Sequence, residues 1–192
     1  GSEAVSYVVE EGYDVIGVEN DLRSYFFGAT ASTARRTQTL VERYPGSFVS
    51  RPIDIRDFDG LDLLFAETKR SLDLVSLTSA HPAHDCAATE PLTDFAVNAN
   101  GTANLLEATR RHAPDATFIF TSTNKVYGDR PNSLPLQELA TRWKLPEDHE
   151  YFGGVPTTMP IDQCLHSLFG VSKAAADLLV QEFGRYFGLP TV

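Results

Sequence analysis

The sequence contains few of the residues that mark disulfide-rich, metal-binding or membrane-embedded proteins. Among its 192 residues are only two cysteines, Cys86 and Cys164, and they form neither a CxxC pair nor part of a metal-ligand cluster. We therefore expect two free thiols, a reducing cytoplasmic location and no metal site. The apolar runs are too short to cross a bilayer, and the N-terminus lacks the basic start and apolar stretch of a signal peptide.

Positive charge is also scarce. The chain has 16 lysines and arginines against 26 aspartates and glutamates, which gives a formal net charge of -10. An acidic surface repels nucleic acids and anionic membranes, so neither is an expected partner. A bound dinucleotide is compatible with this charge, because helix dipoles and backbone N–H groups can hold phosphate locally.

The order of the predicted elements indicates an α/β protein. Hydrophobic residues make up 42% of the chain, enough for the core of a single domain. Short apolar runs predict strands at 14–18, 48–49, 73–78 and 116–122, and helical spacing predicts helices over 3–11, 31–44, 58–70, 91–112 and 167–187. In the first helix, the spacing of Ala4, Val5, Val8 and Val9 predicts one buried stripe. Alternation of this kind is typical of a Rossmann-type doubly wound parallel sheet.

The two ends interrupt this pattern. A doubly wound domain opens with a strand and a glycine-rich turn, whereas this chain begins Gly1-Ser2 and continues directly into a helix. Gly1 is either the last glycine of a GxxGxxG turn or, with Ser2, the remnant of an expression tag. We expect residues 1–192 to be a partial nucleotide-binding Rossmann domain, without its first strand and without a C-terminal substrate lobe.

Residues 129–162 form an irregular insertion. Five of the eleven prolines fall in it, together with Gly153 and Gly154. The insertion follows the 116–122 strand, so it should lie over the carboxyl end of that strand. Ligands bind at that edge of open α/β sheets, which predicts a substrate-side role.

Two carboxylates stand where a dinucleotide would be recognised. Glu19 follows the 14–18 strand, about 18 residues after Gly1, where a carboxylate can accept both hydroxyls of an adenosine ribose. Its charge would repel a 2′-phosphate, which favours NAD over NADP, although nearby Arg23 could tolerate a phosphate. Asp54 is placed to accept from the adenine amino group, or else to cap the next helix.

The last helix carries an unusual pair. Phe169 and Lys173 are four residues apart and therefore share a helix face. In a dehydrogenase this spacing joins a tyrosine to a lysine, and the tyrosinate removes the proton of a substrate hydroxyl. Phe169 has no hydroxyl and cannot do so. Hydroxyls at the end of the 116–122 strand, in Thr121-Ser122-Thr123, can hold a substrate oxygen.

Several longer segments resemble the extended short-chain dehydrogenase/reductases, and among them the NAD-dependent nucleotide-sugar epimerases and dehydratases, most closely the CDP-paratose 2-epimerases. Residues 122–129, STNKVYGD, resemble the segment that carries their catalytic Ser or Thr. Residues 98–108, NANGTANLLEA, are similar to their NxxGTxNLLEA helix, and residues 166–177, HSLFGVSKAAAD, to their HSPYGxSKxAAD segment. The resemblance extends to FGLPTV at 187–192 and covers nearly the whole chain.

The resemblance implies a role for each matching position. It implies cofactor contacts from Gly1, Glu19, Asn20, Asp54, Ile55, Ser79, Ala80, His81, Asn98, Thr121 and Lys173. It implies substrate contacts from His84, Thr123 and Asn124. It implies catalytic roles for Thr123 and Lys173, with Phe169 in the place of the catalytic tyrosine.

The function that the resemblance implies is epimerisation of a nucleotide-linked sugar through transient hydride transfer to bound NAD, with a nucleotide-sugar dehydratase as an alternative. Because Phe169 lacks a hydroxyl, three explanations stay open. His84, His166 or Cys164 could serve as the base, the protein could be a ligand-binding relative without turnover, or Phe169 could be an engineered knockout. The family also implies a homodimer formed through the 91–112 and 167–187 helices.

Overall fold

The computed structural model describes residues 1–68, 71–80 and 84–192, and for His84 only its place at the start of a helix. The principal strands are β1 (Val15–Val18), β2 (Phe48–Arg51), β3 (Leu74–Leu77) and β4 (Thr117–Phe120). The helices are α1 (Ser2–Glu10), α2 (Leu22–Phe27), α3 (Ala34–Arg43), α4 (Phe58–Glu67), α5 (His84–Thr89), α6 (Pro91–Phe95), α7 (Gly101–His112) and α8 (Leu168–Phe187). The predicted strands and long helices are confirmed, whereas α2 and α5 were not predicted.

The four strands form two parallel pairs. β1 pairs with β2, and β3 pairs with β4, to which Thr191 adds a parallel bridge at Phe118. Within the described ranges, no strand ladder joins the two pairs. Thr121 N donates to Leu77 O at 3.2 Å, so β3 and β4 end side by side. The segments that follow the strands therefore gather at one edge.

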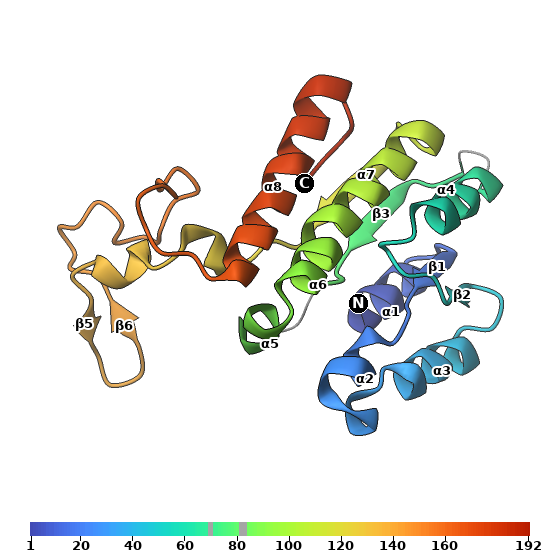
Figure 1. The fold of residues 1–192 in the computed structure, drawn as a ribbon, viewed down its shortest axis with the longest axis horizontal. Coiled ribbons are helices and arrows are strands. Elements are labelled where there is room, and N and C mark those ends of the chain that lie inside the picture. Colours follow the sequence, from blue (N-terminus) through green and yellow to red (C-terminus); the bar gives the residue numbers. More distant parts are fainter. Residues whose placement is uncertain (69–70, 81–83) are drawn as a thin grey trace.

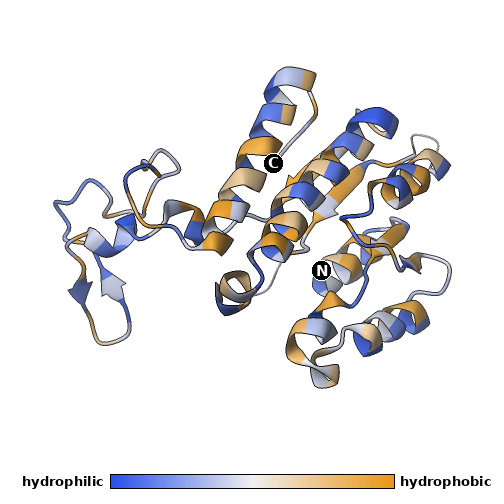
Figure 2. Cartoon of the chain, viewed as in Figure 1, coloured by the Kyte–Doolittle hydropathy of each residue, from blue (hydrophilic) through white to orange (hydrophobic). Residues whose placement is uncertain are grey.

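The core lies between β3, β4 and a row of three helices, α4, α7 and α8 (Figure 1). Leu61 of α4, Leu106 of α7 and Phe118 of β4 are fully buried. Spacing predicts inward faces on the 58–70 and 91–112 helices, and both are confirmed because the residues concerned are buried: Leu61, Leu64, Phe65, Leu105, Leu106 and Ala108. Figure 2 shows the apolar residues concentrated on β3 and on the faces of these helices.

Helix α1 does not have the fully buried stripe that its spacing predicts. Ala4 is exposed, and Val5, Val8 and Val9 are only half-buried. The helix contacts α3 and β1 but lies outside the main core, so one side is open. Polar contacts at its surface, such as Arg43–Glu10 at 3.0 Å, link it to α3.

The predicted 91–112 helix is continuous in path but changes its winding. Between α6 and α7, residues Ala96–Asn100 form a π-helical turn. Such turns insert an extra residue into the helix and often occur near functional sites. The π-turn and α6 pack against α8, where three buried polar residues meet: Asp94, Asn98 and Ser172.

The segment between β4 and α8 extends away from the body of the molecule (Figure 1). It contains a small antiparallel hairpin, β5 (Gln137–Glu138) with β6 (Trp143–Lys144), and two short 3-10 turns, η3 (Asn124–Tyr127) and η4 (Arg130–Ser133). Gly128 has a φ of 62°, and a Cβ there would lie 2.7 Å from Leu165 O. Only glycine permits this close return of the insertion onto the start of α8.

Both cysteines are free, as the sequence predicts. In the part of the chain that the structure describes, no helix has the length and apolar character needed to span a membrane.

Candidate functional site

A pocket opens where the carboxyl ends of β1, β2 and β3 meet. Six of the residues predicted to contact a cofactor line it: Glu19, Asn20, Asp54, Ile55, Ser79 and Ala80. Thr78 also lines the pocket, and a Cβ on Gly1 would lie 3.2 Å from its Oγ1. The N-terminus of α1 therefore abuts this pocket, where helix N–H groups favour an anion.

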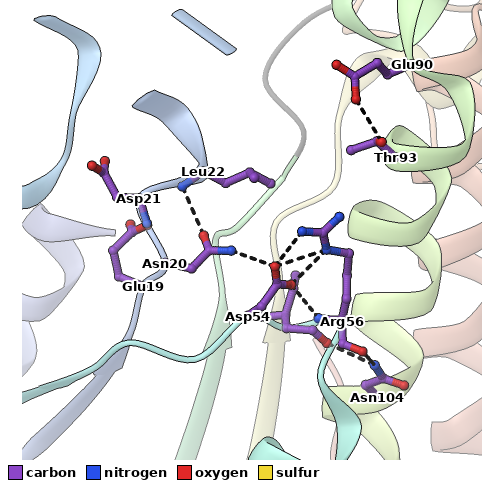
Figure 3. A network of polar contacts seen from close by, with 10 residues as sticks. Glu19, Asn20, Asp21, Leu22, Asp54, Arg56, Glu90, Thr93 and Asn104 are labelled. Carbon is purple, nitrogen blue, oxygen red and sulfur yellow. Dashed lines mark hydrogen bonds and ion pairs between the residues drawn. The ribbon is translucent and has the colours of Figure 1, made fainter. Parts of the chain in front are cut away.

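A polar network forms one wall of the pocket (Figure 3). Asn20 Nδ2 donates to Asp54 Oδ2 at 2.8 Å, and the Arg56 guanidinium contacts the same carboxylate at 2.6 Å. Hydrogen bonds from Arg56 are the largest influence that holds the pKa of Asp54 below its ordinary value. Asn104 of α7 donates to the carbonyls of Ile55 and Arg56, which fixes this turn on the core helix. Asp54 is thus an organiser of the pocket wall, and Asp57 rather than Asp54 caps α4.

Glu19 presents a partly free carboxylate to solvent. Its Oε1 accepts from Asp21 N at 2.7 Å, while Oε2 accepts no hydrogen bond from the described residues. Asp21 has a φ of 55° and accepts from Ser32 Oγ at 2.6 Å and from Thr33 N at 2.7 Å. These bonds lower the pKa of Asp21. They tie the start of α2 to the start of α3 and hold the intervening segment beside Glu19.

Helix α2, which was not predicted, forms another wall through Leu22, Arg23 and Phe26. Tyr25 OH donates to Glu90 Oε1 at 3.2 Å, so α2 is linked to the residue that precedes α6. The only signal for this contact in the sequence is the aromatic cluster Tyr25-Phe26-Phe27 soon after a strand end.

A second group of predicted residues lies at the end of β4. Lys173 is only 3% exposed, and its Nζ donates to Thr121 O at 2.8 Å and lies 4.1 Å from the centre of the Phe120 ring. Burial lowers the pKa of Lys173 to about 8, against an opposing effect of Asp177. The ammonium is therefore held at the carboxyl edge of the sheet.

Thr123 caps the 3-10 turn η3, where its Oγ1 accepts from Lys125 N at 3.4 Å. Asn124 follows it and lines a second hollow together with Tyr127 of η3 and Val155 of the insertion. Phe169 is half-buried one helical turn before Lys173. The structure thus brings Thr121, Thr123 and Lys173 to one edge, on the side of the sheet that continues into the insertion.

Asn98, another predicted cofactor contact, is buried away from the first pocket and from the end of β4. Asn98 is 2% exposed, and its amide donates to Asp94 Oδ1 at 3.1 Å and to Ser172 Oγ at 2.9 Å. It joins the π-turn to α8 inside the protein, which does not support the expected cofactor contact. His81 lies outside the described residues, as does the side chain of His84.

Two of the proposed substitutes for the tyrosine contact one another. Cys164 Sγ lies 3.3 Å from His166 Nε2, which is itself 2.7 Å from Ile161 O. Both groups contact the carbonyl of Ile161 in the insertion, Cys164 at 3.3 Å, and Cys164 also lies 3.6 Å from Tyr127 O of η3. These contacts hold the segment just before α8 against η3 and the end of the insertion.

Comparison with known proteins identifies the family of the chain. The sequence model of one family, described as GDP-mannose 4,6-dehydratase, matches residues 1–192, which is the whole chain. The chain belongs to the GDP-mannose 4,6-dehydratase family. The resemblance to nucleotide-sugar epimerases and dehydratases that the motifs indicate is thereby confirmed.

The curated proteins that resemble this chain include enzymes with several activities. CDP-paratose 2-epimerase of Salmonella typhi is 32% identical over the whole chain, which covers 52% of that enzyme. A dTDP-glucose 4,6-dehydratase of Escherichia coli is 29% identical, with 49% of its length covered. The chain thus spans about half the length of these curated relatives.

The solved structures confirm the Rossmann-type α/β fold. The structure of Thermus thermophilus UDP-glucose 4-epimerase, a complex with NAD, matches the whole of this chain with a TM-score of 0.68 and 25% identity. The match covers 49% of that enzyme.

Proposed function

We propose that the protein binds NAD across the carboxyl edge of its strands and acts on a nucleotide-linked sugar as an epimerase similar to CDP-paratose 2-epimerase. The observation that carries this proposal is the position of Glu19 and Lys173 at the same edge, each beside the end of a strand. A dinucleotide that lay along this edge would have its adenosine at the first pocket and its nicotinamide near Lys173. Family membership and the NAD complex of the Thermus relative support the same cofactor.

The residues present fit a dinucleotide. The free Glu19 oxygen can accept from ribose hydroxyls, and the N-terminus of α1, with Gly1 close to Thr78, can offer helix N–H groups to a phosphate. Glu19, Asp21 and Asp54 make this end acidic, which disfavours the extra 2′-phosphate of NADP. When bound, NAD supplies the acceptor and donor of a hydride.

The chain's own groups would orient the sugar. The Thr123 hydroxyl can hydrogen-bond a substrate oxygen, and the Lys173 ammonium can hold hydroxyls at the same edge. Phe169 offers only an apolar ring surface, so it supplies no proton acceptor. The insertion at 129–162, with Asn124 at its border, is proposed to contact the sugar nucleotide.

A second candidate function is ligand binding without turnover, which Phe169 favours. A sugar-nucleotide dehydratase is the alternative within the same chemistry, because a dTDP-glucose 4,6-dehydratase is among the relatives.

The complete purified protein can separate these functions. Co-purified NAD(H), detected by absorbance and fluorescence, would support the cofactor assignment. Incubation with CDP-sugars and UDP-sugars should then give a transient NADH signal and an epimerised product. Binding without NADH or product would favour the ligand-binding module, and a 4-keto-6-deoxy product would favour the dehydratase. A Glu19→Ala variant should bind NAD more weakly, on the order of tenfold, and should lose the preference for NAD over NADP.

A further inference from the structure

Helix α8 places three side chains at one-turn intervals on a single face: Phe169, Lys173 and Asp177. The second and third of these contact adjacent residues at the end of β4. Lys173 Nζ donates to Thr121 O at 2.8 Å, and Ser122 Oγ donates to the Asp177 carboxylate. The segment that leads to Thr123 is therefore attached to α8 at two consecutive positions.

Asp177 is itself held in a defined orientation. Its Oδ2 accepts from Ser122, and its Oδ1 accepts from Gln181 Nε2 at 2.8 Å. Each carboxylate oxygen thus has a donor, one from the strand end and one from the next turn of the helix. A charged acceptor makes the contact with Ser122 stronger than a neutral one would.

We propose that Asp177 is a positioning residue of the active site, which fixes the Thr121–Thr123 segment against α8 and places a carboxylate one helical turn from Lys173. The proposal rests on the proposed function, in which Thr123 and Lys173 contact the substrate. A tyrosine at position 169 would offer Lys173 a phenolate, but Phe169 carries no charge. The carboxylate of Asp177, one turn further along the same face, is the negative charge that raises the pKa of Lys173.

The electrostatics agree with this geometry. Asp177 raises the pKa of Lys173, while burial lowers that pKa to about 8. Among the elements packed against α8, α6 contributes Asp94, which accepts from Ser172, and η3 contributes Lys125 and Tyr127. Asp177 is the charged group whose effect on Lys173 is resolved.

Three variants of the complete protein separate the charge from the contact. Asp177→Asn removes the charge but keeps an oxygen that can accept from Ser122. Ser122→Ala removes the hydroxyl but keeps the charge. Glu182→Gln is the matched control, because it removes one carboxylate from the same helix nine residues beyond Lys173, on the order of 13 Å along the axis.

The titration of Lys173 is the deciding measurement. The chain has four lysines, so 13C labelling at lysine Cε gives a spectrum in which Lys173→Arg identifies the signal of interest. The wild-type midpoint is expected at about pH 8. Asp177→Asn should lower the midpoint of Lys173, because the neighbouring negative charge is removed. Ser122→Ala and Glu182→Gln should leave the midpoint unchanged. Asp177→Glu, which keeps the charge, should have a midpoint close to that of wild type. An unchanged midpoint in Asp177→Asn would overturn the proposal.

Turnover gives the second readout. With a nucleotide-sugar substrate, Asp177→Asn and Ser122→Ala should each lower kcat on the order of tenfold, with KM changed less than about twofold. Equal kcat values in wild type and both variants would also overturn the proposal. If the wild type itself turned over no sugar nucleotide, the proposed function would fail while the lysine titration would still decide the role of Asp177.

Discussion

The side-chain amide of Asn20 donates to the carboxylate of Asp54 across 34 positions in sequence, at 2.8 Å. This bond joins the segment after β1 to the segment after β2 and forms part of the polar wall of the first pocket. Arg56 completes the arrangement by contacting the same carboxylate at 2.6 Å. Because this network joins two walls of the pocket, changes in it should alter both the stability of the protein and its affinity for a ligand.

Asp54→Asn should lower the free energy of unfolding at neutral pH by about 1 kcal/mol, because the Arg56 contact is partly exposed and screened. The pKa of Asp54 is lower in the folded protein than its ordinary value of 3.8, so the wild-type contribution is present above that pH. It is lost as the pH falls through the lower, folded-state pKa. In denaturant unfolding, the free energy of unfolding should thus decrease less in Asp54→Asn than in wild type as the pH falls from 7 to 3. Glu147→Gln, at an exposed residue of the insertion, is the control, and equal acid profiles for Asp54→Asn and wild type would contradict the prediction.

Gly101→Ala tests the contact between α7 and the adenosine end of the pocket. A Cβ at Gly101 would lie 2.6 Å from Ile55 Cδ1, so Ile55 would have to move. We expect a loss of about 1 to 3 kcal/mol in unfolding free energy and weaker NAD binding. Gly153→Ala, where a Cβ would meet nothing within 4 Å, should change stability by less than about 0.5 kcal/mol. Similar melting temperatures for the two variants would count against this packing argument.

Lys173→Met should make the protein more stable at neutral pH while impairing its function. In the unfolded chain Lys173 has its ordinary pKa of 10.5, whereas burial lowers the pKa to about 8 in the folded protein. Between these values the unfolded chain holds more protons, so wild-type stability rises with pH. The variant avoids the cost of burying the ammonium but loses the hydrogen bond to Thr121, so it should be about 2 kcal/mol more stable than wild type at pH 7. This difference in stability should shrink toward pH 10.

Unfolding curves of the Lys173→Met variant and of wild type at a series of pH values would measure this difference. The control is Lys125→Met, at an exposed lysine, whose free energy of unfolding should change with pH as that of wild type does. A constant difference between Lys173→Met and wild type across the range would mean that Lys173 titrates normally in the folded state.

Phe169→Tyr should raise epimerase turnover in the complete protein. The new hydroxyl would lie one helical turn from the Lys173 ammonium, which favours the phenolate and restores a proton acceptor. A positioned base of this kind contributes about 100-fold or more to the rate. Single-turnover NADH formation with a sugar nucleotide is the measurement. Unchanged or lower activity would show that another group already supplies the base.

Much of the fold follows from local patterns in the chain. The apolar runs ending at Val18, Leu77 and Phe120 predict strands because a buried parallel strand has no polar face. Helical spacing places Leu61 and Leu106 in the core, where both are fully buried. Helices α2 and α5 are six residues each, too short for a clear periodic signal. The prediction of a buried stripe on α1 is wrong, because spacing indicates which face of a helix is apolar but not how much protein covers that face.

The sequence by itself determined the order of strands and helices, the family motifs and the residue types at each strand end. Tertiary structure alone decided which of these side chains meet: Asn20 with Asp54, Asn98 with Ser172 rather than the pocket, and Lys173 with Thr121. The reason is physical. Strand and helix preferences depend on neighbours within a few residues, whereas these hydrogen bonds join groups 34 to 74 positions apart and form only when packing brings their elements together.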